Sequence, residues 1–145
     1  MKRITGITVL LADDNAVVRK AFRTILELED DLEVVGEAED GKQAVAMAKK
    51  LRPALVLMDV TMPLLNGLQA TCQIVKAVPT AKVLMLSAHG DEAYIEAAVN
   101  SGAMGYLIKH TSADCVCQAI REVHKGNPFF SPSIPKRLHK RKKIC

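Results

Sequence analysis

The sequence LVLMDVTMP, residues 55–63, indicates the fold class of this chain. Its first four residues are apolar without polar alternation, which is typical of a strand that is buried on both faces of a sheet. Asp59 follows at the point where that strand should end. An ionised carboxylate beside a core costs several kcal/mol unless other groups compensate for its lost hydration. Asp59 is therefore either a simple turn residue or part of a functional site.

Short apolar runs alternate with amphipathic segments along most of the chain. The predicted strands are residues 7–12, 33–38, 55–58, 82–87 and 105–109. The predicted helices follow them at about residues 17–26, 41–51, 67–78, 91–101 and 112–125. In the third helix, Leu68, Cys72 and Val75 are expected to face the core. Five strand–helix units over residues 5–126 predict one doubly wound α/β domain with a parallel sheet.

The composition excludes several other classes of protein. The 145 residues are 49% hydrophobic and 25% charged, without Trp, which fits one globular domain with an aliphatic core. No apolar run approaches the roughly 20 residues that cross a bilayer, so we expect a cytoplasmic protein without a membrane partner. The four cysteines lack the spacing of a metal site.

The net charge of +4 is unevenly distributed along the chain. Residues 127–145 contain six Lys or Arg side chains and no acidic one, so residues 1–126 carry a net charge of −2. Three of the six prolines also fall in this C-terminal stretch. We therefore expect residues 127–145 to form a flexible, Pro-containing linker with a basic end.

The polar residues that could carry chemistry follow the predicted strands directly. Asp13 and Asp14 follow the first strand, Asp59 the third, Ser87 the fourth and Lys109 the fifth. In an open parallel sheet, ligands bind beyond the carboxyl ends of the strands, where the strand order reverses. These five side chains are therefore expected to lie close together.

Three carboxylates at one edge of a sheet would raise their own pKa values unless a cation neutralised them. Mg²⁺ fits such an all-oxygen site, since it typically takes one or two carboxylates, water and phosphate oxygens. Lys109 adds a mobile positive charge, and Ser87 adds a hydroxyl donor. The combination predicts a site for a phosphoryl group, with a nucleophile among the acids.

The segments around these residues are closely similar to those of a known family. Four segments resemble the receiver domains of two-component response regulators: VLLADDN (9–15), LVLMDVTMPLLNG (55–67), KVLMLSAHGDE (82–92) and GAMGYLIKH (102–110). The resemblance covers about residues 4–126 and implies a flavodoxin-like sheet with strand order 2-1-3-4-5. EVVGEAEDGKQAV (33–45) and GNPFFSPSI (126–134) further resemble receivers joined to a helix-turn-helix DNA-binding domain.

The resemblance implies that Asp59 is the phosphoacceptor. A histidine kinase or phosphotransfer protein would be the donor, with a phosphohistidine as the attacked group. Asp14 would bind Mg²⁺ directly and Asp13 mainly through water. The backbone carbonyl of Thr61 would be a further ligand.

The same resemblance assigns the phosphoryl oxygens to Ser87 and Lys109. Tyr106 would be an aromatic switch, whose ring turns inward when Ser87 moves onto the phosphoryl group. His89 and His110 closely follow Ser87 and Lys109 in the sequence, and they are candidates for tuning the lifetime of the phosphoryl group.

The output of such a switch stays open at the level of sequence. A helix-turn-helix domain needs on the order of 60 residues, so DNA contact is expected only through an output domain that this sequence does not contain. The chain is either the receiver part of a transcription regulator or a stand-alone receiver that acts by protein contact. A homodimer through the first or the fifth helix is reasonable for this family. Only self-catalysed phosphotransfer and slow self-dephosphorylation are expected, not turnover of another substrate.

Three alternatives use the same architecture. A phosphohydrolase with an aspartyl nucleophile would need a second acid two residues later, where this chain has Thr61. A flavin-binding module would need hydroxyl and amide donors after the first strand, where this chain has acids. A receiver that folds without being phosphorylated would not need the complete set of acids.

Overall fold

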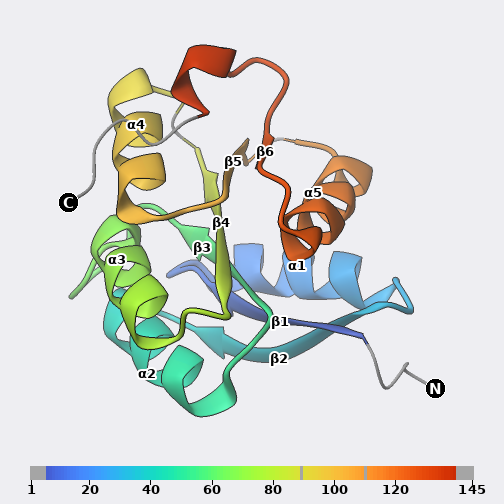
Figure 1. The fold of residues 1–145 in the computed structure, drawn as a ribbon. Helices are drawn as coiled ribbons and strands as arrows, with labels where there is room; N and C mark the ends of the chain where they lie inside the picture. Colours follow the sequence, from blue (N-terminus) through green and yellow to red (C-terminus); the bar gives the residue numbers. More distant parts are fainter. Residues whose placement is uncertain (1–5, 89, 110, 140–145) are drawn as a thin grey trace.

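Strands and helices alternate along the computed structural model, which describes residues 6–88, 90–109 and 111–139 (Figure 1). The strands are β1 (Ile7–Ala12), β2 (Leu32–Ala38), β3 (Leu55–Asp59), β4 (Lys82–Ser87), β5 (Gly105–Ile108) and β6 (Phe129–Phe130). The α-helices are α1 (Ala16–Glu27), α2 (Gly41–Leu51), α3 (Gly67–Ala77), α4 (Glu92–Ser101) and α5 (Ala113–Lys125), and a 3₁₀ helix, η1, spans Lys136–Leu138. Within the described ranges, none of these helices combines the length and the apolar character needed to span a bilayer.

The sheet is parallel throughout, with strand order β2-β1-β3-β4-β5-β6. The predicted order 2-1-3-4-5 is confirmed, and the two-residue β6 extends the sheet beside β5. The order reverses between β1 and β3, which lie next to each other although β2 comes between them in sequence. The loops after β1 and β3 therefore meet at the topological switch point, where doubly wound folds bind ligands.

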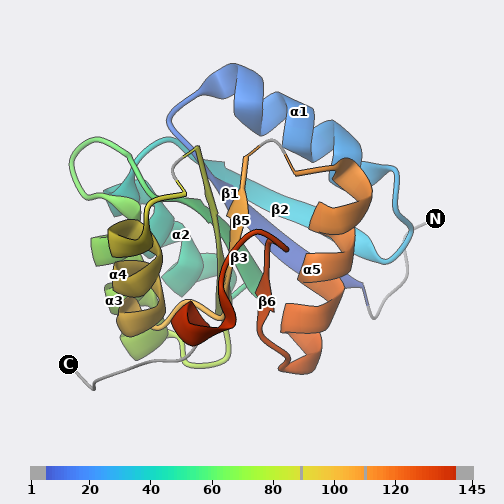
Figure 2. The ribbon, with the colours of Figure 1, turned by 90° about the horizontal axis from the view of Figure 1, so that it is seen from above.

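Helices cover both faces of the sheet, α1 and α5 on one and α2, α3 and α4 on the other (Figures 1 and 2). The arrangement of the helices explains why residues 55–58 of β3 are all apolar. Val56 and Met58 belong to the core under α2, α3 and α4, whereas Leu55 and Leu57 belong to the core under α1 and α5. Side chains of a strand alternate between faces, so a strand covered on both sides contributes to two cores.

Local capping explains where several helices begin and end. The Asn15 side chain accepts the N–H groups of the first turn of α1, and Asp40 does the same for α2, as its position predicts. Asn66 begins α3 with a reciprocal capping box to Gln69. Gly102 ends α4 in the left-handed conformation that glycine adopts without strain.

The inward face of α3 differs from the prediction. Ala70, Thr71 and Ile74 are fully buried against the sheet, whereas Leu68 and Val75 pack only partly on the core. Cys72 is also only partly buried. The helix lies between α2 and α4 and contacts both (Figure 1), so part of its surface packs on these helices and not on the sheet.

The stretch after α5 also differs from the prediction of a flexible linker, at least over residues 127–139. Phe130, Ile134 and Leu138 are buried in the core beneath α4, and β6 pairs with β5. The apolar residues between the prolines account for this docking, because their burial compensates for ordering the chain. The basic end, residues 140–145, lies outside the described residues.

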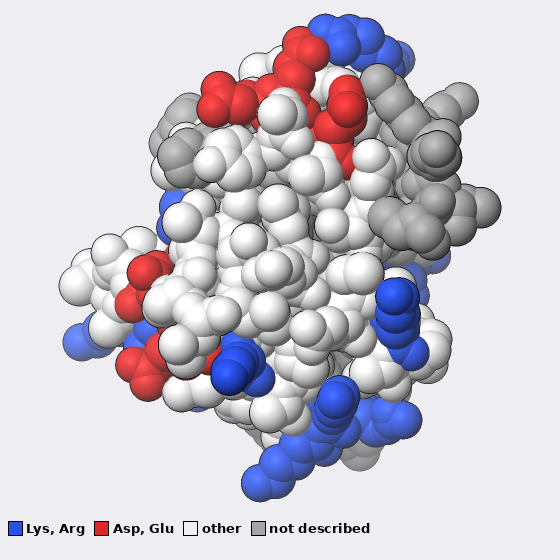
Figure 3. Space-filling model, turned by 90° about the vertical axis from the view of Figure 1, so that its left-hand side faces the viewer, with Lys and Arg blue, Asp and Glu red and all other residues white. Residues whose placement is uncertain are grey.

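Charge is unevenly distributed over the face that α2, α3 and α4 form. Figure 3 shows acidic side chains near the top of this face with basic ones at the upper edge. Mainly basic side chains lie toward the bottom, with some acidic ones at the lower left, and a largely uncharged surface lies between top and bottom. Glu92 of α4 accepts a hydrogen bond from Arg137 of the C-terminal segment at 3.0 Å. This exposed ion pair adds little stability, so the apolar residues hold the segment in place.

Candidate functional site

The carboxyl ends of β1 and β3 bring three acids together. Ligand oxygens of Asp13, Asp14 and Asp59 all lie within 4.8 Å of one another. Asp13 and Asp59 are buried, and Asp14 is exposed. The convergence predicted from the strand ends is therefore found for all three acids, at the point where the strand order reverses.

Lys109 completes this cluster from β5. Its Nζ lies 2.9 Å from Asp13 Oδ2 and 3.5 Å from Asp59 Oδ1. Burial alone would lower the pKa of Lys109, but the hydrogen bond with Asp13 and the charge of Asp59 outweigh it and raise the pKa. Lys109 is therefore a permanent cation that partly neutralises the acids.

Asp59 is the most perturbed carboxyl of the cluster. Its pKa is raised from 3.8 to about 6, first by burial and then by the negative charge of Asp13. The charge of Lys109 and a backbone hydrogen bond from Thr61 act in the opposite direction. Asp59 is consequently mostly ionised at neutral pH, but in a setting that favours any added cation.

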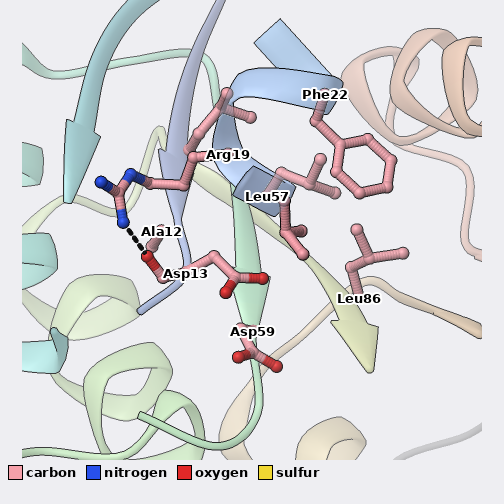
Figure 4. A pocket seen from close by; sticks show the side chains of 9 residues that line it. Ala12, Asp13, Arg19, Phe22, Leu57, Asp59 and Leu86 are labelled. Atoms are coloured by element: carbon pink, nitrogen blue, oxygen red, sulfur yellow. Dashed lines mark hydrogen bonds between the residues drawn. The ribbon is translucent and has the colours of Figure 1, made fainter. Parts of the chain in front are cut away.

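The burial of Asp59 has a visible cause. A small cavity beneath α1 is lined by apolar side chains, among them Phe22, Leu57 and Leu86, with Asp13 and Asp59 at its edge (Figure 4). These side chains exclude water from one side of the two carboxylates. The other side faces Lys109 and the strand-end loops.

Asp13 is fixed by its neighbours as well as by its burial. Its Oδ1 accepts the Asn15 N–H at 2.8 Å, and its backbone oxygen accepts Arg19 Nη1 at 2.6 Å (Figure 4). Arg19 is held in turn by Glu37 on β2 at 3.1 Å. The sequence did not single out Arg19, because an arginine inside an amphipathic helix carries no local signal of this contact.

A close backbone approach explains the glycine that begins α3. A Cβ atom on Gly67 would lie 1.9 Å from the backbone oxygen of Asp59. The Gly67 N–H donates to the Val60 oxygen at 2.7 Å, which ties the start of α3 to the end of β3. In the connecting loop Leu64 has φ +68° and is 75% exposed, so its left-handed backbone is not repaid by side-chain burial.

Ser87 of β4 and Tyr106 of β5 lie on neighbouring strands, two positions apart in register, and both are fully buried. Burial raises the pKa of Tyr106, while a hydrogen bond with the Ser87 side chain acts in the opposite direction. The Tyr106 ring thus occupies the inward position in this structure. Thr61, whose backbone hydrogen-bonds to Asp59, is exposed. His89 and His110 lie outside the described residues.

These features define a class, the doubly wound α/β domains with an acidic, cation-compatible site at the switch point. A family model described as the response regulator receiver domain matches residues 9–121. The chain belongs to this receiver-domain family.

Named relatives agree with this assignment. The chain is 37% identical over 134 residues to the transcriptional regulatory protein DegU of Brevibacillus brevis, covering 92% of this chain and 57% of DegU. It is 39% identical over 128 residues to the transcriptional regulatory protein LnrK of Bacillus subtilis, covering 88% and 58%. The chain thus spans a little over half the length of these relatives.

A solved structure agrees as well. The crystal structure of a LuxR-family two-component response regulator from Aurantimonas sp. SI85-9A1 superposes with a TM-score of 0.85 at 31% identity. The match covers 89% of this chain and 92% of that one.

Proposed function

We propose that this receiver domain accepts a phosphoryl group on Asp59 from the phosphohistidine of a histidine kinase or phosphotransfer protein. The observation that carries the proposal is the cluster of Asp13, Asp14 and Asp59 beside Lys109 at the switch point of the sheet. In the transfer, an Asp59 carboxylate oxygen attacks phosphorus, the N–P bond of the phosphohistidine breaks and the imidazole leaves. The product is an acyl phosphate on Asp59.

The raised pKa of Asp59, about 6, is compatible with this role. At neutral pH most molecules carry the ionised, nucleophilic carboxylate. Burial also reduces the hydration that a nucleophile must lose before it attacks. The same burial, together with the charge of Asp13, opposes further negative charge at the site unless a cation compensates for it.

The site fits Mg²⁺ by its donor set. Carboxylate oxygens of Asp13, Asp14 and Asp59 lie within reach of one ion, and hard cations with oxygen ligands suit such a set. The backbone carbonyl of Thr61 would be a fourth protein ligand. Bound Mg²⁺ would supply the positive charge that balances the acids and the phosphoryl oxygens.

Lys109 and Ser87 would hold the phosphoryl oxygens. Lys109 already reaches Asp59 from β5, and Ser87 ends the strand between them. Because Ser87 also bonds Tyr106, any movement of Ser87 toward the phosphoryl group alters the partner of a buried ring. Tyr106 would then act as the switch that changes the surface of α4, β5 and α5, by shifting an existing equilibrium.

The output that we propose is control of transcription through a DNA-binding domain outside this sequence. The relatives DegU and LnrK are named as transcriptional regulatory proteins and are longer than the part this chain matches. Stand-alone action by protein contact is the alternative. A cytoplasmic location and a homodimer accompany the proposal.

Phosphorylation by a small donor tests this function. The protein is incubated with Mg²⁺ and phosphoramidate, and intact mass spectrometry should show about 80 Da added, the mass of one phosphoryl group. Asp59→Asn should abolish the adduct. Asp30→Asn, at an exposed acid between α1 and β2, should keep it. An undiminished adduct in Asp59→Asn would refute the proposal. Multiple turnover of small phosphate esters would instead favour a phosphohydrolase.

A further inference from the structure

The C-terminal segment, residues 129–138, borders β5, the strand that Lys109 directly follows. It lies beyond residues 9–121, which the family model matches. The Phe129 N–H donates to the Met104 oxygen at 3.3 Å, and the Ser131 N–H donates to the Tyr106 oxygen at 3.0 Å. The segment therefore supplies the outer hydrogen-bond partners for β5, which would otherwise be the edge of the sheet.

Ser131 continues this pairing where the backbone of the segment turns away. Pro132 follows Ser131, and the backbone oxygen of Ser131 accepts the Ile134 N–H at 2.9 Å, which closes the turn. Its side-chain hydroxyl instead accepts the Ile108 N–H at 3.0 Å. Ser131 is 3% exposed, so this bond is shielded from water.

The opposite side of the same strand end is held by β4. The Lys109 N–H donates to the Ser87 oxygen at 2.7 Å, and Ser87 pairs with Ile108 in the sheet. Successive N–H groups of a strand point to opposite sides. The backbone of residues 108 and 109 is therefore bonded on one side by Ser87 and on the other by the hydroxyl of Ser131.

Thr111 adds a second contact to this hydroxyl. Its Oγ1 lies 3.3 Å from Ser131 Oγ, and its N–H donates to the Ile108 oxygen at 2.9 Å. The turn that follows Lys109 is thus tied to the same serine. From this backbone the Lys109 side chain reaches Asp13 and Asp59, so a shift of the strand end moves the ammonium relative to both acids.

We propose that Ser131 is a positioning residue for Lys109, and that the segment after α5 thereby completes the phosphoacceptor site. This inference rests on the proposed function of that site. By linkage, engagement of Lys109 at an occupied site also acts on the docking of residues 129–138.

The docking of the segment does not depend on Ser131 alone. Phe130, Ile134 and Leu138 are buried in the core, and the Phe130 ring stacks on His139 with centroids 4.0 Å apart. Ser131→Ala removes one hydroxyl and leaves these contacts in place. The variant should therefore fold, with the change concentrated at the backbone of residues 108 and 109.

The test measures initial rates of phosphorylation by phosphoramidate and Mg²⁺, using intact mass. Ser131→Ala should slow the reaction roughly three- to tenfold, less than the hundredfold that a full ångström of misplacement can cost. Ser131→Thr, which keeps the hydroxyl, should restore most of the rate. Ser133→Ala, at an exposed serine of the same segment, should match the wild type.

A double-mutant cycle separates positioning from general damage to the fold. If Ser131 acts through Lys109, then adding Ser131→Ala to Lys109→Ala should cause no further loss of rate. An equal fractional loss in both backgrounds would overturn the inference, as would a wild-type rate in Ser131→Ala. If the wild type is phosphorylated, either of these results for the variants leaves the proposed function intact. Absence of any adduct on the wild type would refute the proposed function itself.

Discussion

Lys109 Nζ lies 3.5 Å from Asp59 Oδ1, although β4 separates the strands from which the two residues come. The contact passes across the carboxyl end of β4. It leaves Asp59 between the cation of Lys109 and the like charge of Asp13. The pKa of Asp59 is nevertheless raised to about 6, so burial and repulsion outweigh the lysine. The site is thus strained electrostatically in a way that a bound cation would relieve.

Asp59→Asn should stabilise the protein above pH 6. Because the folded-state pKa is raised, the folded protein binds this proton more tightly than the unfolded chain does, and stability falls as pH rises from 3.8 to about 6. A shift of this size corresponds to about 3 kcal/mol, which partial screening reduces to roughly 1–2 kcal/mol. Urea unfolding at pH 7.5 should show this gain, and it should shrink at pH 5. A gain that is larger at pH 5 would contradict the assignment.

Mg²⁺ should raise the unfolding temperature of the wild type, since an ion that binds only the folded state stabilises it by mass action. Asp14→Ala should remove most of this effect while changing metal-free stability little, because Asp14 is exposed. Calorimetry with and without Mg²⁺ measures both quantities. Asp30→Ala is the matched control at another exposed acid and should respond to Mg²⁺ like the wild type. A normal Mg²⁺ response in Asp14→Ala would exclude Asp14 as a ligand.

Gly67→Ala should destabilise the protein by at least about 2 kcal/mol, the usual cost of overpacking against groups that cannot move freely. The new Cβ would meet the Asp59 backbone oxygen at 1.9 Å, so phosphorylation should slow as well. Denaturant unfolding and the mass assay measure the two effects. Gly90→Ala places its Cβ in ordinary contact, 3.5 Å from Ile108 Cδ1, and serves as the control. Equal stability of the two variants would show that the close approach is not limiting.

Leu138→Ala should cost about 2–5 kcal/mol if the C-terminal segment is part of the core, as its 1% exposure indicates. Leu28, which is 77% exposed, gives the control substitution, and Leu28→Ala should change stability by no more than about 0.5 kcal/mol. Chemical denaturation compares them. A Leu138→Ala protein as stable as the control would mean that the segment docks weakly in solution.

The strand–helix alternation could be predicted from sequence because its signals are local. Apolar runs such as 55–58 and the caps Asp40 and Gly102 act within a few residues, and the structure confirms them. Placement of the acids followed from one topological rule, since parallel strands end at the same edge. The roles of Asp59 and its neighbours in phosphoryl transfer stay predictions.

The features that sequence did not predict depend on distant parts of the chain. The inward face of α3 was assigned to Leu68 and Val75, but the neighbouring helices α2 and α4 occupy its sides and leave Ala70 and Ile74 against the sheet. Docking of residues 129–138 depends on a hydrophobic surface made by α4 and β5. The local sequence of this stretch is rich in prolines and basic residues, which is typical of a linker, and it therefore did not predict the docking.

The chemical identity of the phosphorylated residue tests the central claim most directly. After reaction with phosphoramidate and Mg²⁺, borohydride reduces an aspartyl phosphate to the alcohol, and peptide mass spectrometry locates the change. The account predicts that the Asp59 side chain is converted into that of homoserine, with Asp13 and Asp14 unchanged. Modification of Asp13, Asp14 or any other residue in place of Asp59, or no reducible acyl phosphate at all, would contradict it.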